Sequence, residues 1–151
     1  MGGAKVRAVG LAVPPYTVGQ DDIKDFAAAL FRSGMANSER LLSVFDNAGI
    51  AVRHFAQPLT WYAVPHTFAE ANQLYERIGL ELAAAASRRA LARSGVRPRD
   101  IGAIVFVSST GIATPTLDAK LIQQLGLSRH AARVPLWGLG CAGGVGGLAR
   151  S

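Results

Sequence analysis

The chain has 151 residues, half of them apolar and 17% charged, which is the balance of a globular domain rather than a disordered segment. Its net charge is +6, from arginines spread along the chain, and the one dense stretch, over 88–99, has no aromatic residue between its arginines. We therefore favour solvated helix surface over attraction to an anionic partner and expect no nucleic-acid binding. No apolar run is long enough to span a bilayer and no signal peptide is visible, so we expect a cytoplasmic protein without membrane insertion.

The first 65 residues predict a strand, two helices, a short strand and a loop. Apolar positions recur at helical spacing after Gln20, and Pro14-Pro15 closes the first apolar stretch. The predicted elements are a strand over 5–13, a helix over 20–32, a helix over 38–47 capped by Asn37 or Ser38, a strand over 51–55 and a loop over 58–65.

The middle of the chain predicts the longest helix, over 67–94, ended by Gly95. Because this helix is apolar on both sides, we expect it to lie buried in the middle of the domain. It precedes IGAIVFVS at 101–108, a continuous apolar run that is typical of a strand buried on both faces.

The last part predicts a turn over 109–115, a helix from Thr116 or Asp118 to Leu125, a strand over 133–137, a glycine-rich elbow over 138–147 and the start of a helix over 145–150. This alternation of strands and helices predicts a layered α/β fold with a mainly parallel sheet. Because the last helix is only a turn or two long, we expect the sequence to be a piece of a longer protein.

Cys141 is the strongest candidate for chemistry. It is the single cysteine, so no internal disulfide is possible, and it lies in GLGCAGGVGG between a predicted strand and a predicted helix. Backbone N–H groups at a helix start favour a thiolate and stabilise the oxyanion that forms when a thioester is attacked. Glycines let the backbone approach the reacting carbonyl closely. We therefore predict that Cys141 is an acyl-accepting nucleophile.

Two other interpretations of this segment compete. A lone cysteine is often a small buried hydrophobe, and the residues alone leave that alternative open. Gly138, Gly140 and Gly143 also fit the G-x-G-x-x-G dinucleotide pattern. The acidic residue expected about 20 positions later lies beyond Ser151, and Pro135 interrupts the preceding strand, so we favour this interpretation less.

Four segments carry a family resemblance that covers essentially the whole chain. They are RAVGLAVPPY near the N-terminus, FDNAGIAVRHFAQPLTWY at 45–62, SSTGIATPTLDAKLIQQLGL at 108–127 and RVPLWGLGCAGGVGGLARS at 133–151. The sequence resembles the bacterial type III polyketide synthases, relatives of chalcone and stilbene synthases in the thiolase superfamily. The resemblance implies a homodimer with the thiolase-like fold (layered αβαβα). Residues 1–151 would be the N-terminal portion, truncated shortly after the nucleophile elbow, so only the first half of that fold.

The resemblance also implies the chemistry. Cys141 matches the family nucleophile, which takes an acyl group from a starter acyl-CoA as a thioester. Decarboxylation of malonyl-CoA then supplies the carbon nucleophile that extends it. Ser109 and Thr110 match positions near the starter-acyl pocket, and Thr114 matches a position that contacts the partner subunit, although Ser and Thr here are also ordinary turn residues. The family uses no metal, flavin or nicotinamide, so we expect no cofactor beyond these coenzyme A substrates.

The sequence departs from the family pattern in one important respect. The family His and Asn that polarise the thioester lie in its C-terminal part, and His54, His66 and His130 do not match that His. We therefore expect this polypeptide to be inactive in condensation by itself. Two alternatives remain: a non-catalytic truncated module that dimerises or binds acyl-CoA, and a ketoacyl synthase relative, which the loop over 110–115 fits less well.

Overall fold

The computed structural model describes residues 4–31 and 38–151 and divides into two compact units. The smaller unit is Val13–His66, and the larger one combines Met1–Ala12 with Thr67–Ser151. Arg32 and Asn37, where a predicted helix ends and a predicted cap stands, lie outside the described residues.

The smaller unit is a two-stranded antiparallel sheet whose strands are joined through two helices, with a short third helix after the second strand. Strand β1 (Tyr16–Gly19) pairs with β2 (Val52–Phe55), with Tyr16 opposite Phe55 and Gly19 opposite Val52. The other elements of this unit are α1 (Gln20–Phe31), α2 (Ser38–Asn47) and α3 (Leu59–Tyr62). The two longer helices and β2 confirm the prediction, whereas β1 was not predicted and the predicted loop over 58–65 contains α3.

Gln20 fixes the start of α1 within the smaller unit. Its buried side chain donates to the carbonyl oxygen of Phe45 at 2.9 Å and accepts from Nε of Arg53 at 3.0 Å. Its backbone N–H donates to the carbonyl oxygen of Ala51 at 2.9 Å. One amide side chain therefore ties the first turn of α1 to the end of α2 and to β2, and satisfies its own buried polar atoms.

The larger unit is built on the long helix α4 (Phe68–Ser94) and a parallel pair of strands. Thr67 and Glu70 form a capping box at the start of α4, and Gly95 ends it with a left-handed backbone at φ 69°. A short 3-10 turn η1 (Pro98–Asp100) leads to β3 (Ala103–Ser108). Helix α5 (Leu117–Leu125), with Thr116 at its N-cap, then crosses over to β4 (Ala132–Trp137).

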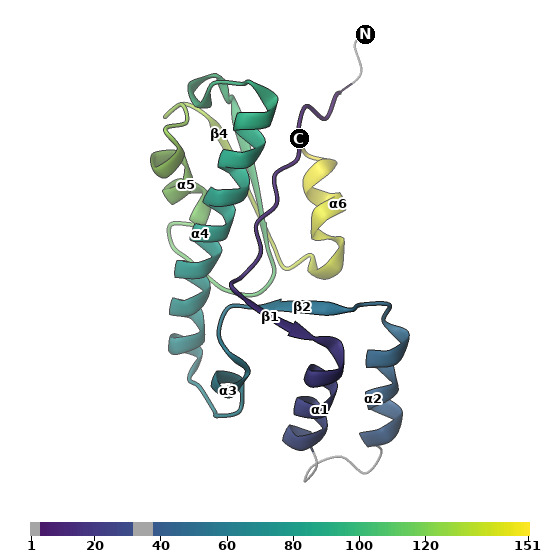
Figure 1. Ribbon diagram of the computed structural model, residues 1–151. Coiled ribbons are helices and arrows are strands. Elements are labelled where there is room, and N and C mark those ends of the chain that lie inside the picture. The colour runs from purple at the N-terminus through teal and green to yellow at the C-terminus, as the bar shows by residue number, and fades with distance from the viewer. Residues whose placement is uncertain (1–3, 32–37) are drawn as a thin grey trace. The chain divides into compact units, whose positions relative to one another are not determined.

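Side chains of β3 alternate between two helix layers. Ile104 and Phe106 pack with Ala84, Leu121 and Leu125 of α4 and α5. Val105 and Val107 face the opposite way, where Val107 lies close to the backbone of the last helix, α6 (Gly143–Leu148). The larger unit is therefore a helix–sheet–helix sandwich (Figure 1), which confirms the predicted layered α/β arrangement with parallel strands.

The expected deep burial of α4 and β3 is not observed. Ala84 is the only α4 residue counted as buried, and the β3 residues after Ala103 are half-buried. The reason is one of size. A helix of 27 residues is about 40 Å long, whereas a six-residue strand is about 20 Å long. Two such strands therefore cover only part of the apolar surface of α4.

The predicted strand over Lys5–Val13 is wrong. Residues 4–12 are in no helix or strand, and they run along α4 (Figure 1). Arg93 of α4 donates to the carbonyl oxygen of Val9 at 2.8 Å, and Arg89 donates to that of Leu11. A Cβ on Gly10 would collide with the carbonyl oxygen of Ala86, so glycine permits this close approach. Arginine side chains, rather than a neighbouring strand, thus bind two backbone acceptors of an apolar stretch.

An ion pair between the buried Asp118 and the partly exposed Arg133 links α5 to β4. Asp118 is fully buried, and its Oδ2 accepts from Nε of Arg133 at 2.5 Å, while Arg133 also donates to Oγ1 of Thr116 at 2.9 Å. Burial acts to raise the pKa of Asp118, but hydrogen bonds from Arg133 and Thr116 outweigh it and hold that pKa below its ordinary value. Among the described residues, Oδ1 of Asp118 is the buried side-chain oxygen or nitrogen without a hydrogen-bond partner.

We predict that Asp118→Asn lowers the free energy of unfolding at pH 7 by about 1.5–3 kcal/mol, the range for a charged hydrogen bond. Because pairing depresses the folded-state pKa of Asp118, its stabilisation is present above the ordinary Asp value of about 4 and disappears as the pH falls through the lower folded-state value. Urea unfolding at several pH values should therefore show the two proteins converging in acid.

Asp100→Asn is the matched control. Asp100 pairs with Arg97 at 2.6 Å on the exposed turn η1. Asp100→Asn should therefore lower the free energy of unfolding by less than Asp118→Asn does. Equal losses for the two variants, or a difference between wild type and Asp118→Asn that stays constant down to strongly acid pH, would contradict this account of the pair.

Candidate functional site

Cys141 lies on the elbow that joins β4 to α6. After Trp137 the backbone turns through Gly138 and Gly140, which have φ of 79° and 53°, values that disfavour other residues. Cys141 is the middle residue of a 3-10 turn η2 (Gly140–Ala142), directly before α6. Its side chain is an exposed free thiol, so in this chain it is not a core residue.

The loop over 109–116 lies at the same edge of the sheet as the elbow. The last residues of the two parallel strands, Ser108 and Trp137, are register partners, and the N–H of Gly138 donates to the carbonyl oxygen of Ser108 at 3.3 Å. The carboxyl ends of parallel strands meet at one edge. The segments that carry Ser109, Thr110 and Thr114 on one side and Cys141 on the other therefore leave the sheet together.

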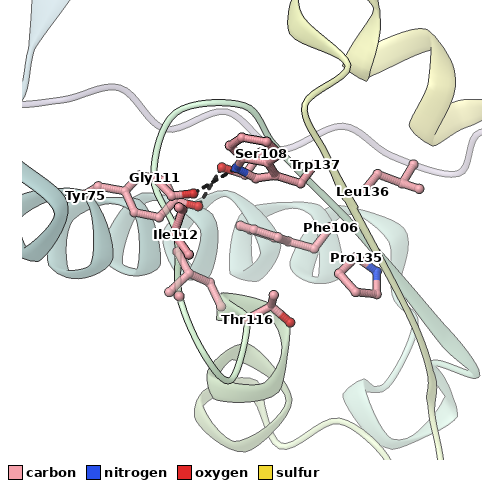
Figure 2. Close-up of a pocket in the computed structure, with 11 residues that line it drawn as sticks. Tyr75, Phe106, Ser108, Gly111, Ile112, Thr116, Pro135, Leu136 and Trp137 are labelled. Atoms are coloured by element: carbon pink, nitrogen blue, oxygen red, sulfur yellow. Dashed lines mark hydrogen bonds between the residues drawn. The ribbon is translucent and has the colours of Figure 1, made fainter.

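The predicted site residues Ser109, Thr110 and Thr114 are exposed on this loop, and none of them lines the cavity beneath it. The cavity measures about 290 Å³ and is formed on the α4/α5 side of the sheet. Its walls come from α4, the ends of β3 and β4, and the loop (Figure 2); they include Tyr75, Phe106, Ser108, Ile112, Pro135 and Trp137. Cys141 does not line it either.

Two hydrogen bonds brace this cavity (Figure 2). The hydroxyl of Tyr75 donates to Oγ of Ser108 at 2.6 Å, and the indole Nε1–H of Trp137 donates to the carbonyl oxygen of Gly111 at 3.0 Å. From the sequence, Tyr75 is only a residue of the predicted helix over 67–94, and Trp137 is only the last residue of the predicted strand over 133–137. The one sequence feature that could have marked Trp137 as a site residue is its position, as a large aromatic residue, immediately before the glycine elbow.

The three histidines lie away from this edge or in the other unit. Nδ1 of His54 hydrogen-bonds with Oγ1 of Thr17 at 3.1 Å, and His66 stacks on Trp61 with ring centroids 3.7 Å apart, both within the smaller unit. His130 precedes β4, at the end of that strand opposite to Cys141. In the part of the chain that the structure describes, no three His, Cys, Asp or Glu side chains gather as metal ligands.

No helix of the described segments has the length and apolar character needed to cross a bilayer.

The whole chain matches one protein family. The model for the N-terminal domain of chalcone and stilbene synthases covers residues 1–151. The chain is 39% identical over 153 residues to a putative chalcone synthase of Bacillus subtilis, covering 98% of this chain and 42% of that protein. It is 38% identical over 148 residues to the 1,3,6,8-tetrahydroxynaphthalene synthase of Streptomyces peucetius, covering 98% of this chain and 39% of that protein.

Solved structures of type III polyketide synthases share the fold. The 1,3,6,8-tetrahydroxynaphthalene synthase of Streptomyces coelicolor superposes with a TM-score of 0.86 at 27% identity, over 95% of this chain and 42% of that one. The C-terminal type III domain of Steely1 from Dictyostelium gives 0.81 at 32% identity, over 95% and 41%. The predicted thiolase-like fold is confirmed for the N-terminal part, and the chain spans about two fifths of these relatives.

We predict that Gly111→Ala destabilises the larger unit by about 1–3 kcal/mol, the usual cost of overpacking. A Cβ on Gly111 would collide with the ring of Tyr75, so the loop or the ring must shift. Thermal and urea unfolding measure the effect. Gly144→Ala in α6 is the matched control, because a Cβ there meets no atom within 4 Å and alanine favours a helix. Equal destabilisation by both changes would contradict the close approach of Gly111 to Tyr75.

Proposed function

The chain belongs to the chalcone and stilbene synthase family, and from that premise we propose that it is the N-terminal part of a type III polyketide synthase in which Cys141 accepts an acyl group from a coenzyme A thioester. The observation that carries this proposal is the exposed free thiol of Cys141 on the glycine elbow after β4. Relatives named tetrahydroxynaphthalene synthase and phloroglucinol synthase support the polyketide branch over the ketoacyl synthases.

The surroundings of the thiol suit attack on a thioester. A Cβ added at Gly138, Gly140 or Gly144 would meet no atom within 4 Å, so space around the elbow is open to an incoming acyl group. In the proposed step the Cys141 thiolate forms a new carbon–sulfur bond with the thioester carbonyl. The bond to the coenzyme A sulfur breaks, and the leaving coenzyme A thiolate takes up the proton that Cys141 gave up.

The loop over 109–116 supplies the remaining proposed roles. Ser109 and Thr110 would contact the starter acyl group, and Thr114 would meet a second copy of the chain in a homodimer. The exposure of all three residues beside the elbow supports this assignment. Malonyl-CoA would be the extender, with no metal or redox cofactor. Because no residue of this chain matches the family His or Asn, we propose that this polypeptide takes an acyl group without extending it.

One observation favours a second candidate, a non-catalytic module that self-associates or binds acyl-CoA. Several large apolar side chains of the larger unit are strongly exposed, among them Leu11 at 70%, Trp137 at 61% and Val145 at 73%. Clusters of exposed apolar surface mark contact sites. If this candidate is right, the chain should elute as a dimer or larger species while Cys141 gains no acyl group.

We predict that incubation with a long-chain acyl-CoA adds one acyl mass to the wild-type chain, and that Cys141→Ala abolishes the addition. Intact mass spectrometry followed by peptide mapping measures it. Adding malonyl-CoA should not increase the mass further. Cys141→Ser is the matched control, because it keeps the shape of the side chain but its hydroxyl ionises far less readily. An adduct that survives Cys141→Ala would exclude Cys141 as the acceptor.

A further inference from the structure

We propose that Asn72 and Trp137 are positioning residues that hold the Gly111–Ile112 peptide, and with it the loop over 109–116, in a fixed place beside Cys141. The inference rests on the proposed function, because its consequence is selectivity for the acyl group that Cys141 accepts. The residues that hold the loop come from α4 and from the last position of β4, so they are far from the loop in sequence.

Asn72 binds the loop as a neighbouring strand would. Its Oδ1 accepts from the N–H of Ile112 at 2.8 Å, and its Nδ2 donates to the carbonyl oxygen of the same residue at 2.8 Å. Ile112 is 55% exposed, and both of these bonds lie at the exposed surface, so water could satisfy the backbone groups if the loop were free. The two bonds are therefore not required by burial. Their effect is to restrict where the loop can lie relative to α4.

Trp137 and Tyr75 hold Gly111, the residue before Ile112. Nε1 of Trp137 donates to the carbonyl oxygen of Gly111 at 3.0 Å, although the residue as a whole is 61% exposed (Figure 2). Gly111 itself is buried against the ring of Tyr75, with no room for a side chain. The Gly111–Ile112 peptide is thus blocked towards α4 by Tyr75 and bonded on its polar atoms by Asn72 and Trp137.

The hydrogen bond from Trp137 to Gly111 connects the loop to a residue that is close to Cys141 in sequence. Trp137 is four residues before Cys141 on the same elbow, and Thr110 immediately precedes Gly111. A shift of the loop is therefore resisted by the residue that begins the elbow. Because a starter acyl group would contact the loop while its carbonyl meets Cys141, the distance between the two segments decides which acyl chains fit.

The test uses variants that remove a hydrogen-bond donor from Asn72 or from Trp137; Nδ2 of Asn72 also donates to Oε1 of Glu76 at 3.4 Å, and that bond is lost with it. Asn72→Asp replaces the donor Nδ2 by an acceptor, and Trp137→Phe removes the indole N–H while keeping a ring. Lys24→Met is the matched control, because Lys24 bonds Asp46 at 2.7 Å within the smaller unit, so its loss removes an ion pair that involves neither Asn72 nor the loop. Each folded variant is measured by hydrogen exchange of the peptide over 109–116 and by the rates of Cys141 acylation with hexanoyl-CoA and palmitoyl-CoA.

We expect exchange over 109–116 to rise roughly threefold to tenfold in both variants, as for loss of one net hydrogen bond. The ratio of the two acylation rates should also change several-fold, whereas Lys24→Met leaves both readouts at wild-type values. A merely structural role would lower both acylation rates together and leave their ratio unchanged. If Asn72→Asp does not fold, Asn72→Ser replaces it.

The outcomes separate this inference from the proposed function. If the wild-type chain takes neither acyl group while its thiol reacts with iodoacetamide, the proposed function fails and the inference fails with it. If the wild type is acylated but the variants keep its exchange rates or its rate ratio, the inference alone is overturned.

Discussion

The parallel pairing of β3 with β4 is the constraint on which the site depends. The ladder runs from Ala103 opposite Ala132 to Ser108 opposite Trp137, so both strands end at the same level. The loop and the elbow that follow them are therefore neighbours, although Ser109 and Cys141 are far apart in sequence. The pairing also sets the two faces of β3, which directs Phe106 towards α4 and α5 and Val107 towards α6.

Much of the fold could be predicted because local chemistry marks it. Gly95 and Gly126 end α4 and α5 with left-handed backbones, and Thr67 and Thr116 stand at their N-caps. The apolar strand β3 and the glycine elbow were equally visible. Cys141 stood out through its residue type and its glycine neighbours, and the family resemblance named its role. The structure adds that the thiol is exposed, while its chemistry stays a prediction.

Two of the differences share a physical cause, which is that side chains distant in sequence bind the backbone in place of a neighbouring strand. The stretch over 5–13 has strand-like residues, but two arginines of α4 bind the carbonyl oxygens of Val9 and Leu11. Asn72 likewise binds both backbone groups of Ile112, 40 residues away. The spacing of apolar residues along the sequence does not indicate contacts of this kind. In the sequence, Asn72 cannot be told from an ordinary solvated residue of a helix; its role becomes visible only when the structure shows the loop beside it.

The proposed site requires that the loop over 109–116 and the thiol of Cys141 lie together at one edge of the sheet. The most direct measurement is cross-linking of Ser109→Cys to Cys141 with a short bis-maleimide, compared with His130→Cys, which lies at the other end of β4, about 20 Å along a six-residue strand. The account predicts rapid intramolecular cross-linking for Ser109→Cys and little for His130→Cys. Equal yields, or cross-linking of His130→Cys alone, would contradict it.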